Sequence, residues 1–171
     1  MGVTVGGDPA PEVVAESGRR FSTTPAAVLV FVVDDRDRIL VFRHPTDGYV
    51  EVVNGGVEAG ETILQAAERE LREEAGTELR ARILGVFHAY TYRYDDRVPR
   101  MTSLAFVASH EGGAARAGDD VAGSSPVWFS APALANGDEG PTIPEETWLF
   151  TAAADAARAW RGRHVDLDPY V

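Results

Sequence analysis

An unbroken run of apolar, mostly branched residues extends from Ala26 to Val33, and acidic residues follow it directly. A strand with one solvent-exposed face would alternate apolar and polar residues, so this run indicates a strand that is buried on both faces. Shorter apolar segments and amphipathic segments follow it in mixed order along the chain. The sequence therefore predicts the α/β class, with a mixed β-sheet that lies between helices.

Turn residues divide the rest of the chain into short segments. We expect Asp34–Asp37 to form a turn and Ile39–Phe42 to be the antiparallel partner of the first strand. Further strands are expected at residues 49–53, 79–94, 101–109 and 126–129, of which 79–94 and 101–109 form a hairpin. Helices are expected at residues 61–75, 130–135 and 145–161.

Length and composition indicate a single domain. The chain has 171 residues, 44% of them hydrophobic, and we place the domain at residues 23–171, after a flexible tail at 1–22. It has neither an apolar run of about 18 residues nor a basic leader, so we expect a cytoplasmic protein without a membrane partner. Its net charge of -11, without a cluster of Lys and Arg, argues against a nucleic-acid partner.

The segment at residues 61–75 carries a dense set of charges. On a helix, residues three and four apart share a face, so Glu70, Glu73 and Glu74 would point toward one region, beside Arg69. Like charges at this spacing repel each other, and a bound divalent cation would reverse the sign of the interaction. The preceding Gly55–Gly56 pair leaves backbone groups free to face a metal ion or a phosphate. The alternative, a solvated helix face without a ligand, leaves these glycines unexplained.

Together these residues resemble the Nudix box, whose pattern is G-x5-E-x7-R-E-U-x-E-E-x-G-U, with U a bulky aliphatic residue. Eight of its nine defined positions are matched, by Gly55, Glu61, Arg69, Glu70, Leu71, Glu73, Glu74 and Gly76. At the ninth, Thr77 replaces the usual aliphatic residue, which weakens local packing but leaves every charged position in place. The resemblance implies a Nudix-type α/β/α sandwich and a Nudix hydrolase, an enzyme that cleaves phosphoric anhydride bonds.

The resemblance also implies a role for each residue of the box. The residues expected to hold Mg²⁺, with Mn²⁺ as its alternative, are Gly55 through its carbonyl, Glu70, Glu73 and Glu74. Arg69 would orient the carboxylates, and Glu61 would contact a metal-bound water or stabilise the first turn of the helix. The base is a box glutamate or an acid of a later loop, where Glu111, Asp119 and Asp120 are candidates. The expected catalytic residues are Arg69, Glu70, Glu73, Glu111 and Asp120.

The expected substrate is a nucleoside diphosphate linked to another moiety, with ADP-ribose or a nucleotide sugar as the first choice. Glu51–Gly56 resembles the E-L-P-x-G-G sequence found before the box in such enzymes and in other members of the family, except that Val53 replaces proline. The residues expected to bind it are Gly55, Gly56, Tyr92 and Tyr94. Tyr90 would share the strand face of these tyrosines, but aromatic packing in a hairpin explains that spacing equally well. The alternatives are hydrolysis of (oxidised) nucleoside triphosphates or dinucleoside polyphosphates, and a catalytically inactive nucleotide-binding Nudix module. The family resemblance further implies a homodimer.

Overall fold

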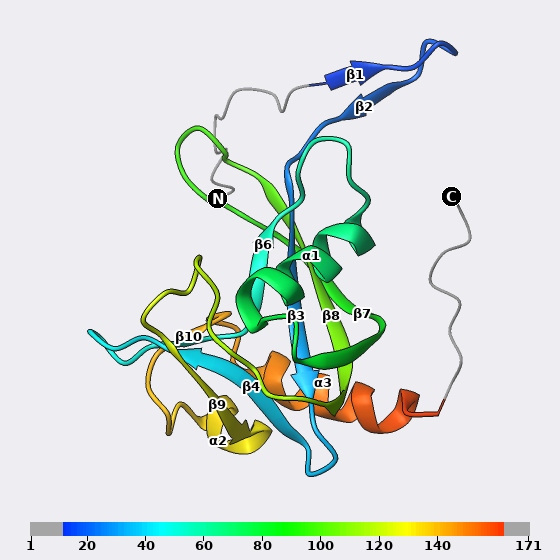
Figure 1. The fold of residues 1–171 in the computed structure, drawn as a ribbon. Helices are drawn as coiled ribbons and strands as arrows, with labels where there is room; N and C mark the ends of the chain where they lie inside the picture. Colours follow the sequence, from blue (N-terminus) through cyan, green and yellow to red (C-terminus); the bar gives the residue numbers. More distant parts are fainter. Residues whose placement is uncertain (1–11, 163–171) are drawn as a thin grey trace, which may run out of the picture.

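The computed structural model describes residues 12–162 (Figure 1). The strands of the main sheet are β3 (Ala26–Val33), β4 (Arg38–Arg43), β5 (Val50–Glu51), β6 (Val53–Gly56), β7 (Arg80–Tyr92), β8 (Met101–Gly112), β9 (Ser125–Ser130) and β10 (Thr142–Ile143). The helices are α1 (Ile63–Ala75), α2 (Ala131–Asn136) and α3 (Trp148–Trp160). The strand order is β10-β5-β4-β3-β8-β7, with β6 also paired to β3 and β9 to β4. Since β3 and β8 are parallel whereas β7 and β8 are antiparallel, the expected mixed sheet and the expected hairpin are confirmed.

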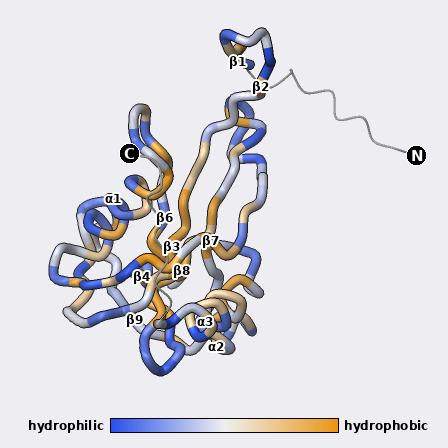
Figure 2. Tube along the Cα trace, turned by 90° about the vertical axis from the view of Figure 1, so that its right-hand side faces the viewer, coloured by the Kyte–Doolittle hydropathy of each residue, from blue (hydrophilic) through white to orange (hydrophobic). Residues whose placement is uncertain are grey.

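The central strand β3 supplies both halves of the hydrophobic core. Its alternate side chains point to opposite faces of the sheet. Val28, Val30 and Val32 pack in the cluster that includes α1, whereas Leu29, Phe31 and Val33 pack in the cluster that includes α2 and α3. Burying one such side chain contributes about 1.5–3 kcal/mol, so the strand anchors helices on both sides. Figure 2 shows this arrangement as hydrophobic strands in the centre with helices to either side.

The expected antiparallel pairing of β4 with β3 is confirmed, although it is short, and two other expectations about individual elements were wrong. β4 aligns with β3 only at Val33 and Ile39, and its main antiparallel partner over six positions is β9, because β6 occupies the edge of β3 beyond that point. The segment expected as one strand at 49–53 forms β5 and β6, and Val52 separates these two strands. The terminal helix begins at Trp148 rather than at residue 145, because β10 pairs with β5 and holds the preceding segment outside the helix.

The expected tail contains two short strands within its described part. β1 (Glu12–Val14) and β2 (Arg20–Ser22) form an antiparallel hairpin that projects from the sandwich in both views (Figures 1 and 2). Residues 1–11 of the tail lie outside the described residues, so the domain division at residue 23 stays a prediction. Of the helices between residues 12 and 162, none combines the length and the hydrophobicity needed to cross a bilayer.

Candidate active site

The charged helix α1 begins and ends at residues suited to these positions. At its start the Thr62 side chain accepts a hydrogen bond from the Gln65 amide, and the Gln65 side chain accepts one from the Thr62 amide. This reciprocal pair satisfies two amides that the helix itself cannot bond. The helix ends at Gly76, whose φ of 80° favours glycine. Glu61 therefore lies before the helix, and its side chain is available for other contacts.

Arg69 connects the loop before α1 to the carboxylates on the helix. Its guanidinium donates hydrogen bonds to Glu61 at 2.8 and 3.2 Å, to Glu70 at 2.7 Å and to Glu73 at 3.0 Å. It also donates to the carbonyl of Gly56 at 2.8 Å. The hydrogen bond with Glu61 is the largest cause that raises the pKa of Arg69, so its charge is permanent. This geometry suits the orienting role expected for Arg69.

Glu70 is buried directly against the glycine loop. The residue is 5% exposed, and burial is the largest cause that raises its pKa, while the hydrogen bond from Arg69 opposes that shift. A Cβ atom at Gly55 would lie well inside 3.0 Å of the Glu70 carboxylate, closer than real Cβ atoms approach. A side chain at position 55 would therefore displace the Glu70 carboxylate, and the pairing of β6 with β3 holds this backbone against the acid.

Glu74 lies deeper and belongs to a buried polar network. It is 5% exposed and accepts a hydrogen bond from the backbone amide of Asn54 at 3.0 Å. The Asn54 side chain donates to Glu51, which also forms a short hydrogen bond with His44. Burial, with further contributions from the charges of Glu51, Glu70 and Asp120, raises the pKa of Glu74 to about 8. Without a cation nearby, Glu74 is therefore mostly protonated at neutral pH.

A later loop adds a third carboxylate to the cluster on the helix. Oxygen atoms of Glu70, Glu73 and Asp120 all lie within 4.8 Å of one another, and among residues 12–162 this is the group of three such side chains close enough to hold a metal ion together. Glu74 is outside this group but lies close enough for its pKa to respond to the charges of Glu70 and Asp120. The sequence did not rank Asp120 above Asp119 or Glu111, whereas the structure brings Asp120 to the helix.

The loop that carries Asp120 is held against the end of α1 by backbone contacts. The amide of Arg116 donates to the carbonyl of Ala75, and the amide of Gly118 donates to that of Glu74, both at 3.0 Å. A Cβ atom at Gly118 would lie far inside 3.0 Å of the Glu73 carbonyl oxygen. Only glycine permits this approach, and the approach places Asp120 beside the cluster.

Glu111 lies elsewhere. In the sheet, Gly55 is opposite Val28 and Val28 is opposite Leu104, whereas Glu111 is farther along β8 toward its other end. Seven strand residues from Leu104 correspond to roughly 23 Å. The Glu111 carboxylate accepts a hydrogen bond from Arg82 at 2.7 Å. The structure therefore separates Glu111 from the carboxylate cluster and gives no support to its expected role as a base.

Replacing Gly118 with alanine should weaken metal binding. The added methyl group would push the loop away from the Glu73 carbonyl and move Asp120 out of the cluster. We expect about a tenfold loss of Mg²⁺ affinity, similar to that of Asp120→Asn, measured by titration calorimetry. Circular dichroism should show retained secondary structure, and an unchanged affinity would contradict the role of this loop.

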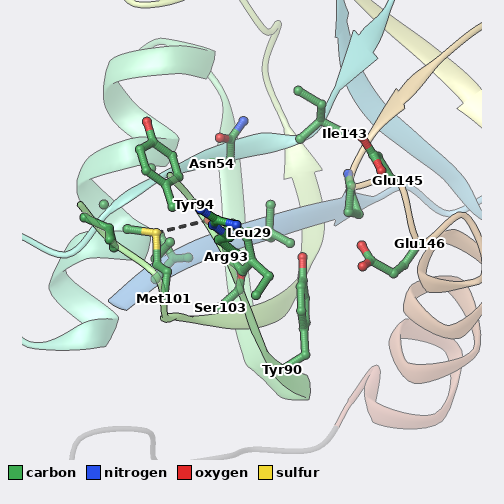
Figure 3. A pocket seen from close by; sticks show the side chains of 17 residues that line it. Leu29, Asn54, Tyr90, Arg93, Tyr94, Met101, Ser103, Ile143, Glu145 and Glu146 are labelled. Atoms are coloured by element: carbon green, nitrogen blue, oxygen red, sulfur yellow. Dashed lines mark hydrogen bonds between the residues drawn. The ribbon is translucent and has the colours of Figure 1, made fainter. Parts of the chain in front are cut away.

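A cavity of about 730 Å³ adjoins the glycine loop, a volume that suits a small-molecule site (Figure 3). Gly55 and Gly56 line it, together with Tyr90, Tyr92 and Tyr94. The hydroxyl of Tyr92 donates to the sulfur of Met101 at 3.1 Å, which the dashed line in Figure 3 marks. All four residues expected to bind substrate therefore border one space, and using this space as the substrate site stays a prediction.

Sequence reasoning missed the opposite wall of this cavity. Ile143, Pro144, Glu145 and Glu146 line it from the segment before α3. Two of them, Glu145 and Glu146, fall in the range expected as helix, and no motif or periodicity distinguishes them. A proline directly before two acids is the only local signal of a helix boundary, and it does not indicate a cavity.

Comparison with known proteins identifies a family and two relatives that are similar to this chain. The chain matches the NUDIX domain family over residues 23–147. It is 33% identical over 102 residues to the ADP-ribose pyrophosphatase of Methanocaldococcus jannaschii, covering 56% of this chain and 57% of the relative. It is 32% identical over 87 residues to the NAD-capped RNA hydrolase NudC of Photobacterium profundum, covering 50% and 30%. The chain thus spans 57% of the length of the first relative and 30% of the second.

The fold of the chain is similar to that of solved structures. A NUDIX-family hydrolase from Clostridium perfringens superposes with a TM-score of 0.60 at 18% identity, over 77% of this chain and 96% of that one. At this identity the likeness concerns the fold alone. Because the family match extends over most of the chain and contains the entire glycine loop and charged helix, the protein belongs to the Nudix family.

Proposed function

We propose that this protein is a Mg²⁺-dependent pyrophosphohydrolase that cleaves the diphosphate of a nucleoside diphosphate linked to another moiety. The observation that carries the proposal is the group formed by Glu70, Glu73 and Asp120, beside the glycine loop and a substrate-sized cavity. ADP-ribose is the first choice of substrate, because the M. jannaschii relative is named an ADP-ribose pyrophosphatase. A nucleotide sugar is the next choice.

The residues of the cluster fit a hard divalent cation. All three offer carboxylate oxygens, which Mg²⁺ and Mn²⁺ prefer over nitrogen or sulfur. Glu74 supports the fit. Its carboxylate is buried and its pKa is raised to about 8, so a cation beside it would stabilise the charged form. When bound, the cation would neutralise charge on the diphosphate oxygens and lower the pKa of an attacking water.

The chain's own residues would orient the reactants. Arg69 holds Glu70 and Glu73 through its hydrogen bonds, and Gly55 leaves space for the acid beside it. Within the cluster, Glu70 and Glu73 accept hydrogen bonds from Arg69, and Asp120 offers one oxygen to the cation, which leaves its second oxygen to accept a proton. We therefore assign Asp120 as the base that takes the proton of the water. The water oxygen bonds to one phosphorus, the bridging P–O bond breaks, and ADP-ribose yields AMP and ribose 5-phosphate.

Removing divalent cations is expected to abolish this hydrolysis. A chelator should lower the rate of ADP-ribose hydrolysis by at least about 100-fold, since the cation supplies most of the charge stabilisation, and added Mg²⁺ or Mn²⁺ should restore it. The measurement is chromatography with mass analysis in oxygen-18 water, which also identifies the phosphorus that is attacked. Hydrolysis that persists in the chelator would contradict the proposal.

The same assay separates the alternative substrates. The panel contains nucleoside triphosphates and their oxidised forms, dinucleoside polyphosphates, and a dinucleotide with an NAD-type end. The last is included because the second relative is named an NAD-capped RNA hydrolase. Binding without turnover of any member would favour an inactive nucleotide-binding module. The homodimer implied by the family is tested separately by light scattering.

A further inference from the structure

The wall of the cavity formed by the segment before α3 is acidic. Glu145 and Glu146 come from this segment, and both are exposed and border the cavity. Figure 3 shows them across the space from Tyr94 and Met101, with Tyr90 between the two sides. The cavity therefore extends from the glycine loop to a pair of carboxylates that belong to a different part of the chain from the Nudix box.

Positive charge is scarce around this space. Arg93 is the basic residue among those that line the cavity, and it forms an ion pair with Asp96. Its side chain is 65% exposed and that of Asp96 is 93% exposed, so the pair is weak and Arg93 can turn toward the cavity. Even then one guanidinium would face two carboxylates. A phosphate group bound here would meet net repulsion.

The remaining lining suits an uncharged group with hydroxyls. Tyr90, Tyr92 and Tyr94 provide ring faces, and carboxylates accept hydrogen bonds from hydroxyl groups. Burial is the largest cause that raises the pKa of Tyr90, and the nearby charge of Glu146 raises it further. The Tyr90 hydroxyl therefore stays protonated. Apolar contacts from Leu29 and Ile143 complete a surface that could hold a ribose or a base.

We propose that this cavity binds an uncharged, hydroxyl-bearing ribose or nucleoside of the substrate, and that Glu145 and Glu146 are specificity-determining residues that reject a phosphate there. The inference rests on the proposed function, because it describes the part of the substrate next to the diphosphate. Nucleoside diphosphate derivatives with free ribose hydroxyls are accepted, whereas those with a phosphate on the ribose in the cavity are excluded.

Binding of non-hydrolysable ligands tests the inference. The probes are the α,β-methylene analogue of ADP-ribose and two derivatives with an added phosphate, one at the 2′ position of the adenosine and one at the 1″ position of the other ribose. Dissociation constants are measured by calorimetry with Mg²⁺ for the wild type, for E145Q/E146Q and for each single variant. The matched control is E78Q, a removal of an exposed carboxylate that pairs with Arg116 and does not line the cavity.

In the wild type, the parent analogue should bind at least about tenfold more tightly than one of the two phosphorylated derivatives. That derivative identifies which ribose occupies the cavity. In E145Q/E146Q the preference should fall to about twofold, because the derivative binds more tightly, while E78Q keeps the wild-type preference. A preference that is absent in the wild type, or that persists in the double variant, would overturn the inference. So would failure of the wild type to bind the parent analogue.

Two outcomes separate this inference from the proposed function. If the phosphate preference depends on Glu145 and Glu146 but ADP-ribose is not hydrolysed, the subsite holds and the proposed hydrolysis is wrong. If ADP-ribose is hydrolysed and the preference is the same in every variant, the hydrolysis holds and the subsite assignment is wrong. Both side chains are exposed, so the glutamine variants should fold, and the single variants provide the comparison if the double variant does not.

Discussion

Replacing Glu74 with glutamine should lower kcat/KM for the substrate by about 100-fold or more and, at the same time, stabilise the cation-free protein at alkaline pH. The loss of activity is expected because glutamine removes a charge beside the proposed cation site. The gain in stability is expected because the carboxylate is buried and ionises only at the cost of leaving water. Glutamine keeps an oxygen that can accept the hydrogen bond from Asn54.

The sign of the pH dependence follows from the raised pKa of Glu74. The pKa is about 8 in the folded protein against 4.5 for an unperturbed glutamate, so folding favours the protonated form. The stability due to this group is complete below pH 4.5 and is lost as the pH rises through 8. At pH 8.5 the glutamine variant should therefore be more stable by roughly 2–5 kcal/mol. This corresponds to a melting temperature about 5–15 °C higher.

Thermal unfolding in a chelator, from pH 4.5 to 8.5, measures this difference. The control is Glu73→Gln, because the Glu73 side chain is 47% exposed and bonded to Arg69. That variant should lose activity without gaining stability. Two results would disprove the role assigned to Glu74: undiminished hydrolysis by Glu74→Gln, or a melting temperature below that of the wild type at every pH.

Replacing Gly55 with alanine should also reduce activity strongly, by about 100-fold. The new methyl group would lie well inside 3.0 Å of the Glu70 carboxylate, so either the carboxylate or the β6 backbone must move. A displacement of about 1 Å among reacting groups is enough for a loss of this size. Overpacking should destabilise the protein by about 1–3 kcal/mol. Kinetic assays and chemical denaturation measure the two effects.

The neighbouring glycine provides the control for stability and metal affinity. A Cβ atom at Gly56 would meet nothing within 4 Å, so Gly56→Ala should unfold at the wild-type denaturant concentration and bind Mg²⁺ as the wild type does. If Gly55→Ala and Gly56→Ala have the same stability and the same affinity for Mg²⁺, the close approach of Gly55 to Glu70 has no functional importance.

Elements with a strong local pattern could be predicted from the sequence. The apolar run in β3, the helical spacing in α1 and the hairpin of β7 and β8 were identified within a few residues of their observed bounds. The pairing of β4 with β9, the split between β5 and β6, and the existence of β10 were not identified. Strand pairing depends on packing between segments that are distant in the sequence, and β10 has two residues, too few for periodicity.

The amino-acid pattern alone placed Glu70, Glu73 and Glu74 toward one region of a helix, beside Arg69, because helical geometry brings residues three and four apart together. It could not single out Asp120 or identify the wall at Glu145, since these residues approach the site only through long-range packing. It could not reveal the raised pKa of Glu74 either, because that depends on how deeply β6 and the following loop bury the carboxylate. Contacts within a helix follow from local spacing, whereas burial and contacts between distant segments exist only once the chain is packed.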